Sequence, residues 1–90
     1  MTDSHPPTKK IRIERVQTGV RIEKRMLKVL KALAEYLDTS LGDLLEGIVL
    51  HALEGKAPPI NADTLQRIEA LKQIYDMDYD SSAAHKFEEI

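Results

Sequence analysis

The pattern of hydrophobic residues changes its period once between residues 16 and 53. One face of the pattern holds Val16, Thr18, Val20 and Ile22, and the other holds Gln17, Gly19 and Arg21. This period of two predicts a short β-strand over residues 17–22. The period then becomes helical, with apolar residues at positions 26, 29, 30, 33 and 37. This spacing predicts a helix from Glu23 to Leu37.

Two further helices are predicted downstream. Ser40 and Asp43 have the spacing of a capping box, and a broad apolar stripe follows at positions 41, 44, 45, 48, 49, 52 and 53. Gly55 predicts the end of that helix. Asp63 and Gln66 have the same spacing, which predicts a third helix that ends near residue 76. Residues 81–89 are expected to form a short, fraying helix.

Composition narrows the class of protein. Ninety residues allow one small domain with appendages, and the absence of cysteine excludes disulfides and thiolate metal sites. No apolar run approaches the roughly 20 residues of a membrane span, and the first residues lack the apolar core of a signal peptide. We therefore expect a cytoplasmic protein that does not enter a membrane.

One strand and two helices are too little to fold alone, because a single strand has two unpaired edges. The simplest closure is a two-fold dimer in which residues 17–22 of two chains pair antiparallel. Thr18, Val20 and Ile22 would then face a shared core. The residues between them would face outward on a two-stranded ribbon, which fits the DNA major groove.

The charge is divided unevenly along the chain. Residues 1–31 hold nine Lys or Arg and three Asp or Glu, a net charge of +6, whereas residues 32–90 hold four and twelve, a net charge of −8. A polyanion is therefore expected to approach the first third of the chain.

The pattern from Gln17 to Leu53 resembles the ribbon-helix-helix family, of which the Arc, MetJ and CopG repressors are members. The residues that carry the resemblance are Gln17-Thr18-Gly19-Val20-Arg21-Ile22, Met26, Leu30, Leu33, Ala34, Ser40-Leu41, Leu45, Val49 and Leu53. It implies a mostly α fold: an intertwined homodimer with a two-stranded antiparallel β-ribbon, here with an additional C-terminal helix. The expected organisation is a flexible basic arm (1–15), the ribbon-helix-helix domain (16–54), a linker (55–61), and a C-terminal helix with an acidic tail (62–90).

The resemblance also implies where DNA would bind. Base contacts fall on Gln17, Gly19 and Arg21. Phosphate contacts fall on the start of the second helix, at Thr39, Ser40 and Leu41, where free amides and the helix dipole favour an anion. The cations Lys24, Arg25 and Lys28 add phosphate attraction, and the DNA-contacting arm would hold Lys9, Lys10, Arg12 and Arg15. Each of these cations also has a plain interpretation as a solvated surface charge.

The expected function is a sequence-specific regulator of transcription, a repressor or an antitoxin-type protein, that binds double-stranded DNA. The alternative is a dimer that serves as a protein-interaction module and binds a toxin or other partner through residues 62–90. No catalytic set, metal site or cofactor site is predicted. Asp76-x-Asp78-x-Asp80 starts like a calcium loop, but Ser81 and Phe87 occupy the positions that need Gly and Glu. The operator, an effector, further assembly on DNA and the packing of the third helix stay open.

Overall fold

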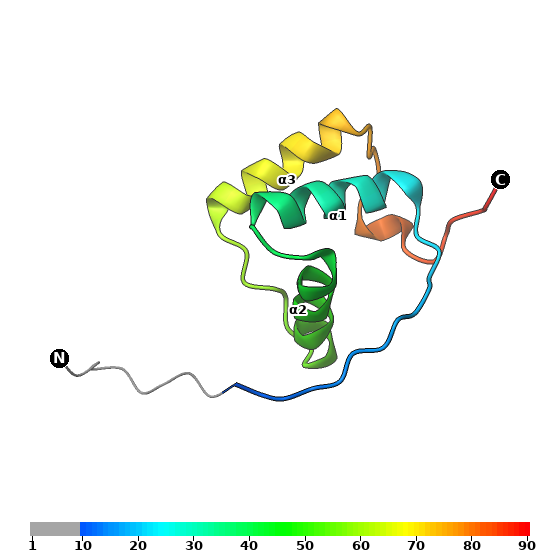
Figure 1. Cartoon of the computed structure of the whole chain (residues 1–90). Coiled ribbons are helices and arrows are strands. Elements are labelled where there is room, and N and C mark those ends of the chain that lie inside the picture. Colours follow the sequence, from blue (N-terminus) through cyan, green and yellow to red (C-terminus); the bar gives the residue numbers. More distant parts are fainter. Residues whose placement is uncertain (1–9) are drawn as a thin grey trace.

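The computed structural model describes residues 10–90, which form three α-helices and a short 3-10 turn. The helices are α1 (Lys24–Tyr36), α2 (Leu41–Leu53) and α3 (Ala62–Ile74), and the turn is η1 (Ser81–Ala83). α3 lies along α1, while α2 runs crosswise to both (Figure 1). Residues 10–23 form an extended segment that passes below α2 and rises to the start of α1 (Figure 1).

The prediction of a ribbon-helix-helix fold with a two-stranded β-ribbon is wrong. Residues 10–90 contain no strand, and the backbone of residues 10–23 is extended without forming a ladder with another segment. The physical reason is that a strand needs a neighbour, and this part of the chain offers only one segment with a period of two. Val20, expected to face a core, is 72% exposed, and Thr18 is exposed as well. The mostly α-helical content is confirmed.

α1 begins at a cap that the sequence did not predict. Glu23 is the N-cap residue, and its carboxylate accepts hydrogen bonds from the backbone N–H groups of Arg25 and Met26, at 3.0 and 3.1 Å. Glu is not among the preferred N-cap residues, but a carboxylate at this place also suits the positive end of the helix dipole. The helix starts one residue after the predicted position for this reason.

All three helices end in the same way. A residue in the left-handed region follows each helix: Asp38 (φ 55°), Gly55 (φ 71°) and Asp76 (φ 55°). The next amide then donates back to the carbonyl of the last turn, as Thr39 does to Ala34 at 2.9 Å. This is the Schellman arrangement, in which glycine is favoured because it has no Cβ to clash.

α3 packs on α1 of its own chain, which the sequence left open. The buried side chains at this contact are Val29 and Leu33 of α1 and Leu71 of α3. α3 is capped by Asn61, whose side chain accepts from the Thr64 amide at 2.7 Å, so the cap lies two residues before the predicted Asp63. The predicted terminal helix over residues 81–89 is reduced to η1.

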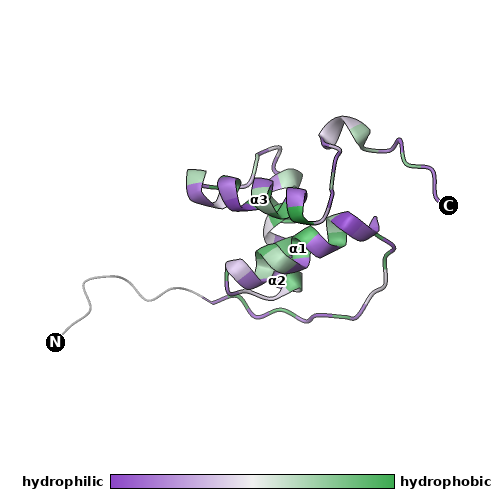
Figure 2. Ribbon diagram, turned by 90° about the horizontal axis from the view of Figure 1, so that it is seen from above, coloured by the Kyte–Doolittle hydropathy of each residue, from purple (hydrophilic) through white to green (hydrophobic). Residues whose placement is uncertain are grey.

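α2 has no buried residue, although most of its residues are apolar. Val49, Leu50 and Leu53 are 50%, 61% and 80% exposed. The predicted cap is present, since the Ser40 hydroxyl accepts from the Asp43 amide at 3.1 Å. The hydrophobic ribbon colour is concentrated at α1 and α2 (Figure 2). A helix that is apolar on most of its surface is normally covered on several sides, so α2 lacks part of its packing in the single chain.

Candidate nucleic-acid interface

The extended segment, defined here as residues 10–22, presents six of the thirteen candidate DNA contacts. Lys10, Arg12, Arg15 and Arg21 are all exposed along it. Lys9, the other member of the predicted arm, lies outside the described residues. The segment is open to a ligand along its length, because every residue from 10 to 21 is exposed.

Arg15 ties the extended segment to α2. Its guanidinium donates to Glu46 at 2.8 and 3.1 Å and to Asp43 at 3.1 Å. The hydrogen bond from Arg15 lowers the pKa of the Glu46 carboxyl, and the same bond raises the pKa of Arg15. These side chains are about half exposed, at 60% for Arg15 and 46% for Glu46, so the contact is a weak surface ion pair.

The three predicted base-contacting residues are all exposed. Gln17, Gly19 and Arg21 alternate along the extended segment, with Arg21 against the carboxylate of Glu89. A Cβ placed on Gly19 would meet no atom within 4 Å, and its φ is not in the left-handed region. The backbone therefore does not require glycine at this position. The base contacts themselves stay a prediction.

The three candidate phosphate-binding cations of α1 fall into two groups. Lys24 and Lys28 are exposed, and the Lys28 ammonium lies 6.0 Å from the centre of the Tyr75 ring. Arg25 is half-buried and donates from Nη1 to the Asp78 carboxylate and to the Asp76 carbonyl, both at 3.0 Å. Lys24 and Lys28 are thus open to a phosphate, whereas Arg25 already holds the C-terminal part of the chain.

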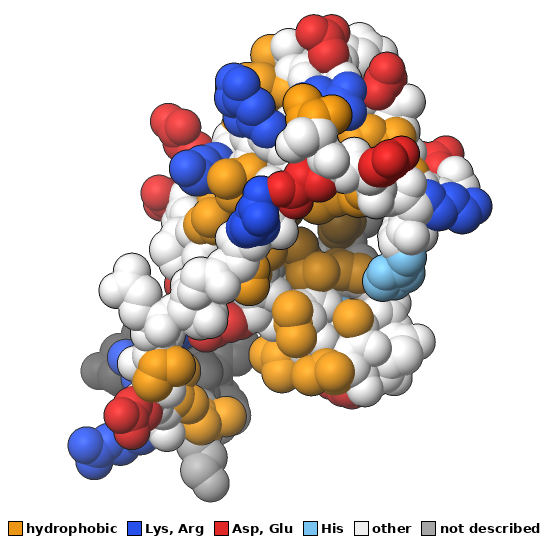
Figure 3. All heavy atoms as spheres, turned by 90° about the vertical axis from the view of Figure 1, so that its right-hand side faces the viewer, with side chains coloured by type: hydrophobic (Ala, Val, Ile, Leu, Met, Phe, Trp, Pro, Cys, Tyr) orange, Lys and Arg blue, Asp and Glu red, His pale blue; other side chains and the backbone are white. Residues whose placement is uncertain are grey.

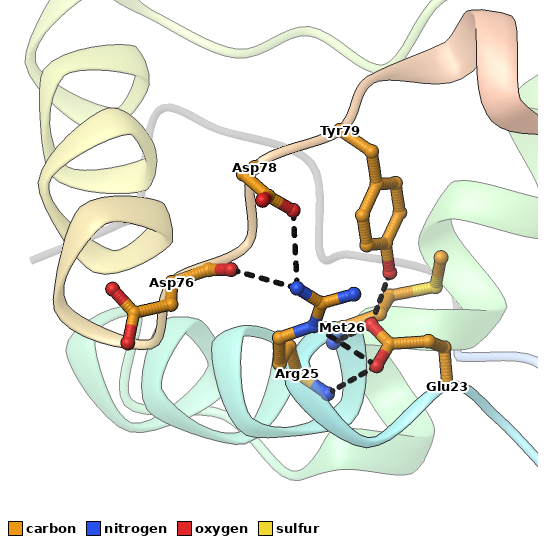
Figure 4. Close-up of polar contacts among 6 residues, drawn as sticks. All are labelled: Glu23, Arg25, Met26, Asp76, Asp78 and Tyr79. Atoms are coloured by element: carbon orange, nitrogen blue, oxygen red, sulfur yellow. Dashed lines mark hydrogen bonds and ion pairs between the residues drawn. The ribbon is translucent and has the colours of Figure 1, made fainter.

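A polar cluster joins the start of α1 to the segment after α3 (Figure 4). The Tyr79 hydroxyl donates to Glu23, and the Arg25 guanidinium lies over the Tyr79 ring, 5.3 Å from its centre. Arg25 Nε also donates to Glu23, at 3.2 Å. We name these four residues, Glu23, Arg25, Asp78 and Tyr79, the α1 clamp. More than fifty residues separate the pair at the start of α1 from the pair after α3, and no local pattern predicted that the two pairs meet.

The α1 clamp shifts the pKa of two of its members in opposite directions. Desolvation opposes the charge on Glu23, but hydrogen bonds from Tyr79, from the amides of Arg25 and Met26, and from the Arg25 side chain outweigh it and lower the pKa of Glu23 to about 2. Burial and the bond to the Glu23 carboxylate raise the pKa of Tyr79 to about 12. At neutral pH Glu23 is therefore charged and Tyr79 keeps its proton.

The predicted phosphate site at the start of α2 is partly occupied by the protein itself. Thr39 N–H donates to the Ala34 carbonyl, and the Ser40 hydroxyl caps the Asp43 amide. Asp43 places a carboxylate in the first turn, with Arg15 beside it. Leu41 is half-buried at the first helical position. A phosphate contact at Thr39, Ser40 and Leu41 stays a prediction, and Arg15 is held beside this helix start by its bond to Asp43.

An apolar groove of about 400 Å³ opens between the helices. Its walls come from every element of the fold, and space-filling shows hydrophobic side chains around a hollow on this side of the molecule (Figure 3). Its lining includes the apolar side chains of Met26, Leu30, Ile48, Ile68, Met77 and Phe87. The groove and the exposed face of α2 are both apolar surfaces of the described residues that are open to a partner.

Comparison with known proteins gives no family. No family model, no curated protein and no solved structure matches the chain. Among residues 10–90 no helix has the length and hydrophobicity needed to cross a membrane. Within the same residues no group of three or more His, Cys, Asp or Glu is placed to hold a metal ion.

Proposed function

We propose that the protein is a regulator of transcription that binds double-stranded DNA and works as a homodimer. The observation that carries this proposal is the placement of positive charge. Exposed cations lie along the extended segment and on α1, and they include Lys10, Arg12, Lys24 and Lys28. The guanidinium groups of Arg15, Arg21 and Arg25 each pair with a carboxylate of the acidic remainder. A basic stripe on an accessible, extended backbone is the electrostatic footprint of a nucleic-acid contact.

The proposed interface makes two kinds of contact, one with phosphates and one with bases. Lys10, Arg12, Lys24 and Lys28 bind phosphates, which supplies affinity without reading sequence. Arg21 and Gln17 lie on the extended segment, which is narrow enough to enter a groove, and they reach base edges there. An arginine that donates two hydrogen bonds to guanine is the commonest specific contact of this kind.

The dimer in this proposal is supported by α2. Val49, Leu50 and Leu53 form an exposed apolar face, and the groove beside Ile48 holds space for side chains of another helix. Covering a large aliphatic side chain contributes roughly 1.5–3 kcal/mol. A second copy offers the same apolar helix, and a two-fold interface lets both copies cover α2 with one contact.

The oligomeric state has a direct test with a matched control. Leu53→Glu places a charge in the proposed interface, and Ile74→Glu places the same charge on an exposed apolar position of α3 that is 66% exposed. Sedimentation equilibrium should give a dimer for the wild type and for Ile74→Glu and a monomer for Leu53→Glu. A wild type that sediments as a monomer at micromolar concentration contradicts the dimer.

The DNA-binding step is tested by fluorescence anisotropy with a labelled duplex over a range of salt concentrations. Log K should fall linearly with log salt, and each phosphate contact contributes about −0.9 to the slope. Lys24→Gln should make the slope shallower, whereas Lys86→Gln, which removes a charge from the C-terminal part, should leave it unchanged. A wild type that shows no binding at low salt would sink the proposal.

A second candidate function follows from the same exposed helix. α2 and the apolar groove are also suited to a helix of a different protein, which would make this chain a protein-interaction module without specific DNA readout. The oligomeric state separates the two candidates. A monomer that binds no duplex at low salt favours the module, whereas a dimer that does bind duplex favours the regulator.

A further inference from the structure

The C-terminal segment, defined here as residues 76–90, contacts the start of α1 with its first residues, and its last residues run outward beside the chain that leads into α1 (Figure 1). Its first part is held by the α1 clamp, through the bonds from Arg25 to Asp78 and from Tyr79 to Glu23 (Figure 4). The Arg25 guanidinium also donates to the backbone carbonyl of Asp76. This part is fixed by groups from both its backbone and its side chains.

Two residues near the end of the segment make further contacts, Phe87 with Tyr79 and Glu89 with Arg21. The rings of Tyr79 and Phe87 meet edge to face, with centres 5.1 Å apart and planes at 78°. Two residues further on, the Glu89 carboxylate pairs with the Arg21 guanidinium. The aromatic contact therefore delivers a carboxylate to a residue that we assign to DNA contact.

We propose that the C-terminal segment is an intramolecular competitor of DNA. Its carboxylates occupy Arg21 and Arg25 in the free protein and are displaced when phosphates and bases approach the extended segment. A carboxylate and a phosphate use the same guanidinium donors, so one cannot be held fully while the other is bound. This inference rests on the proposed DNA-binding function and adds its regulation: free protein is held in a weaker-binding state by its own acidic end.

The strength of the ion pair between Arg21 and Glu89 determines how much the C-terminal segment weakens DNA binding. Both side chains are exposed, at 85% and 65%, so the pair is of the weak surface kind. Removing it should therefore tighten DNA binding by about two- to fivefold. The segment tunes affinity and does not abolish binding.

The test compares two neighbouring carboxylates. Glu89→Gln removes the partner of Arg21, and Glu88→Gln removes the same charge one residue away. Anisotropy with a duplex of random sequence at low salt should show the gain for Glu89→Gln and a clearly smaller one for Glu88→Gln. In an Arg21→Gln background the advantage of Glu89→Gln should vanish. Equal gains for the two carboxylates, or a gain that persists without Arg21, would overturn the competitor role.

A measurement on the free protein tests the attachment of the C-terminal segment independently of DNA binding. NMR signals of the Phe87 ring should shift in Tyr79→Phe, which loses the bond to Glu23, and stay in place in Tyr75→Phe. The competitor role fails alone under three conditions: the wild type binds duplex, Arg21→Gln weakens that binding, and Glu88→Gln and Glu89→Gln have the same effect. If the wild type binds no duplex while the Phe87 signals respond as expected, the segment is attached but the function and its regulation fail together.

Discussion

Glu23→Gln tests whether the α1 clamp stabilises the fold. Gln keeps the shape of the side chain and one acceptor oxygen, but it loses the charge that faces Arg25 and receives the amides of the first helical turn. Lowering the pKa of Glu23 from 4.5 to about 2 corresponds to about 3 kcal/mol in favour of the charged form. Solvent reaches 21% of the Glu23 side chain and 39% of the Arg25 side chain, so we expect a loss of about 1–2 kcal/mol.

The assay is urea denaturation of the wild type and Glu23→Gln at matched protein concentration and at several pH values. The folded-state pKa of Glu23 is depressed, so its contribution is complete above about pH 4.5 and is lost as the pH falls toward about 2. The gap between wild type and variant should therefore be largest at pH 7 and should narrow below about pH 4.5.

A matched control is Glu35→Gln, because Glu35 is exposed on the same helix. This variant should stay within about 0.5 kcal/mol of the wild type at every pH, as surface substitutions usually do. The reasoning is refuted if Glu23→Gln is as stable as the wild type at pH 7. It is refuted equally if the gap is independent of pH.

Three further outcomes are expected. Asp38→Gly should raise the free energy of unfolding by about 0.5–1 kcal/mol, since Asp38 sits at φ 55° where glycine has no penalty, and thermal denaturation measures this. Gly55→Ala should lower the free energy of unfolding by about 1 kcal/mol. The space around Gly55 (φ +71°) is open, so this loss comes from backbone conformation alone. An unchanged free energy of unfolding would contradict the left-handed end of α2. Arg21→Ala should cost about 1–3 kcal/mol of affinity for a selected DNA site and relax one base position per half-site, and an equal loss on scrambled DNA would exclude base reading.

The helices could be predicted from local pattern, because amphipathic spacing and caps act over a few residues. The predicted range of Glu23 to Leu37 differs from α1 by one residue at each end, and Ser40 caps α2 as expected. The end of α2 at Gly55 was also predicted, because a left-handed residue at that position favours glycine.

The features that the sequence pattern did not predict correctly depend on contacts between residues far apart in sequence. A period of two over residues 17–22 indicates a backbone that is ready to pair, but it does not supply the neighbour that makes a strand. The α1 clamp joins Glu23 to Tyr79 across the whole of α1, α2 and α3, so no local spacing shows it. The exposed cations were visible in the sequence, whereas the carboxylates that hold Arg15, Arg21 and Arg25 were not.

We propose that the basic extended segment reads double-stranded DNA. The most direct measurement is selection of bound sequences from random duplex DNA by the purified wild-type protein at low salt. A dimer with Arg21 at base edges should enrich a short inverted repeat, and the same selection with Arg21→Ala should lose one position of each half. Recovery of sequences with no common element would contradict the claim.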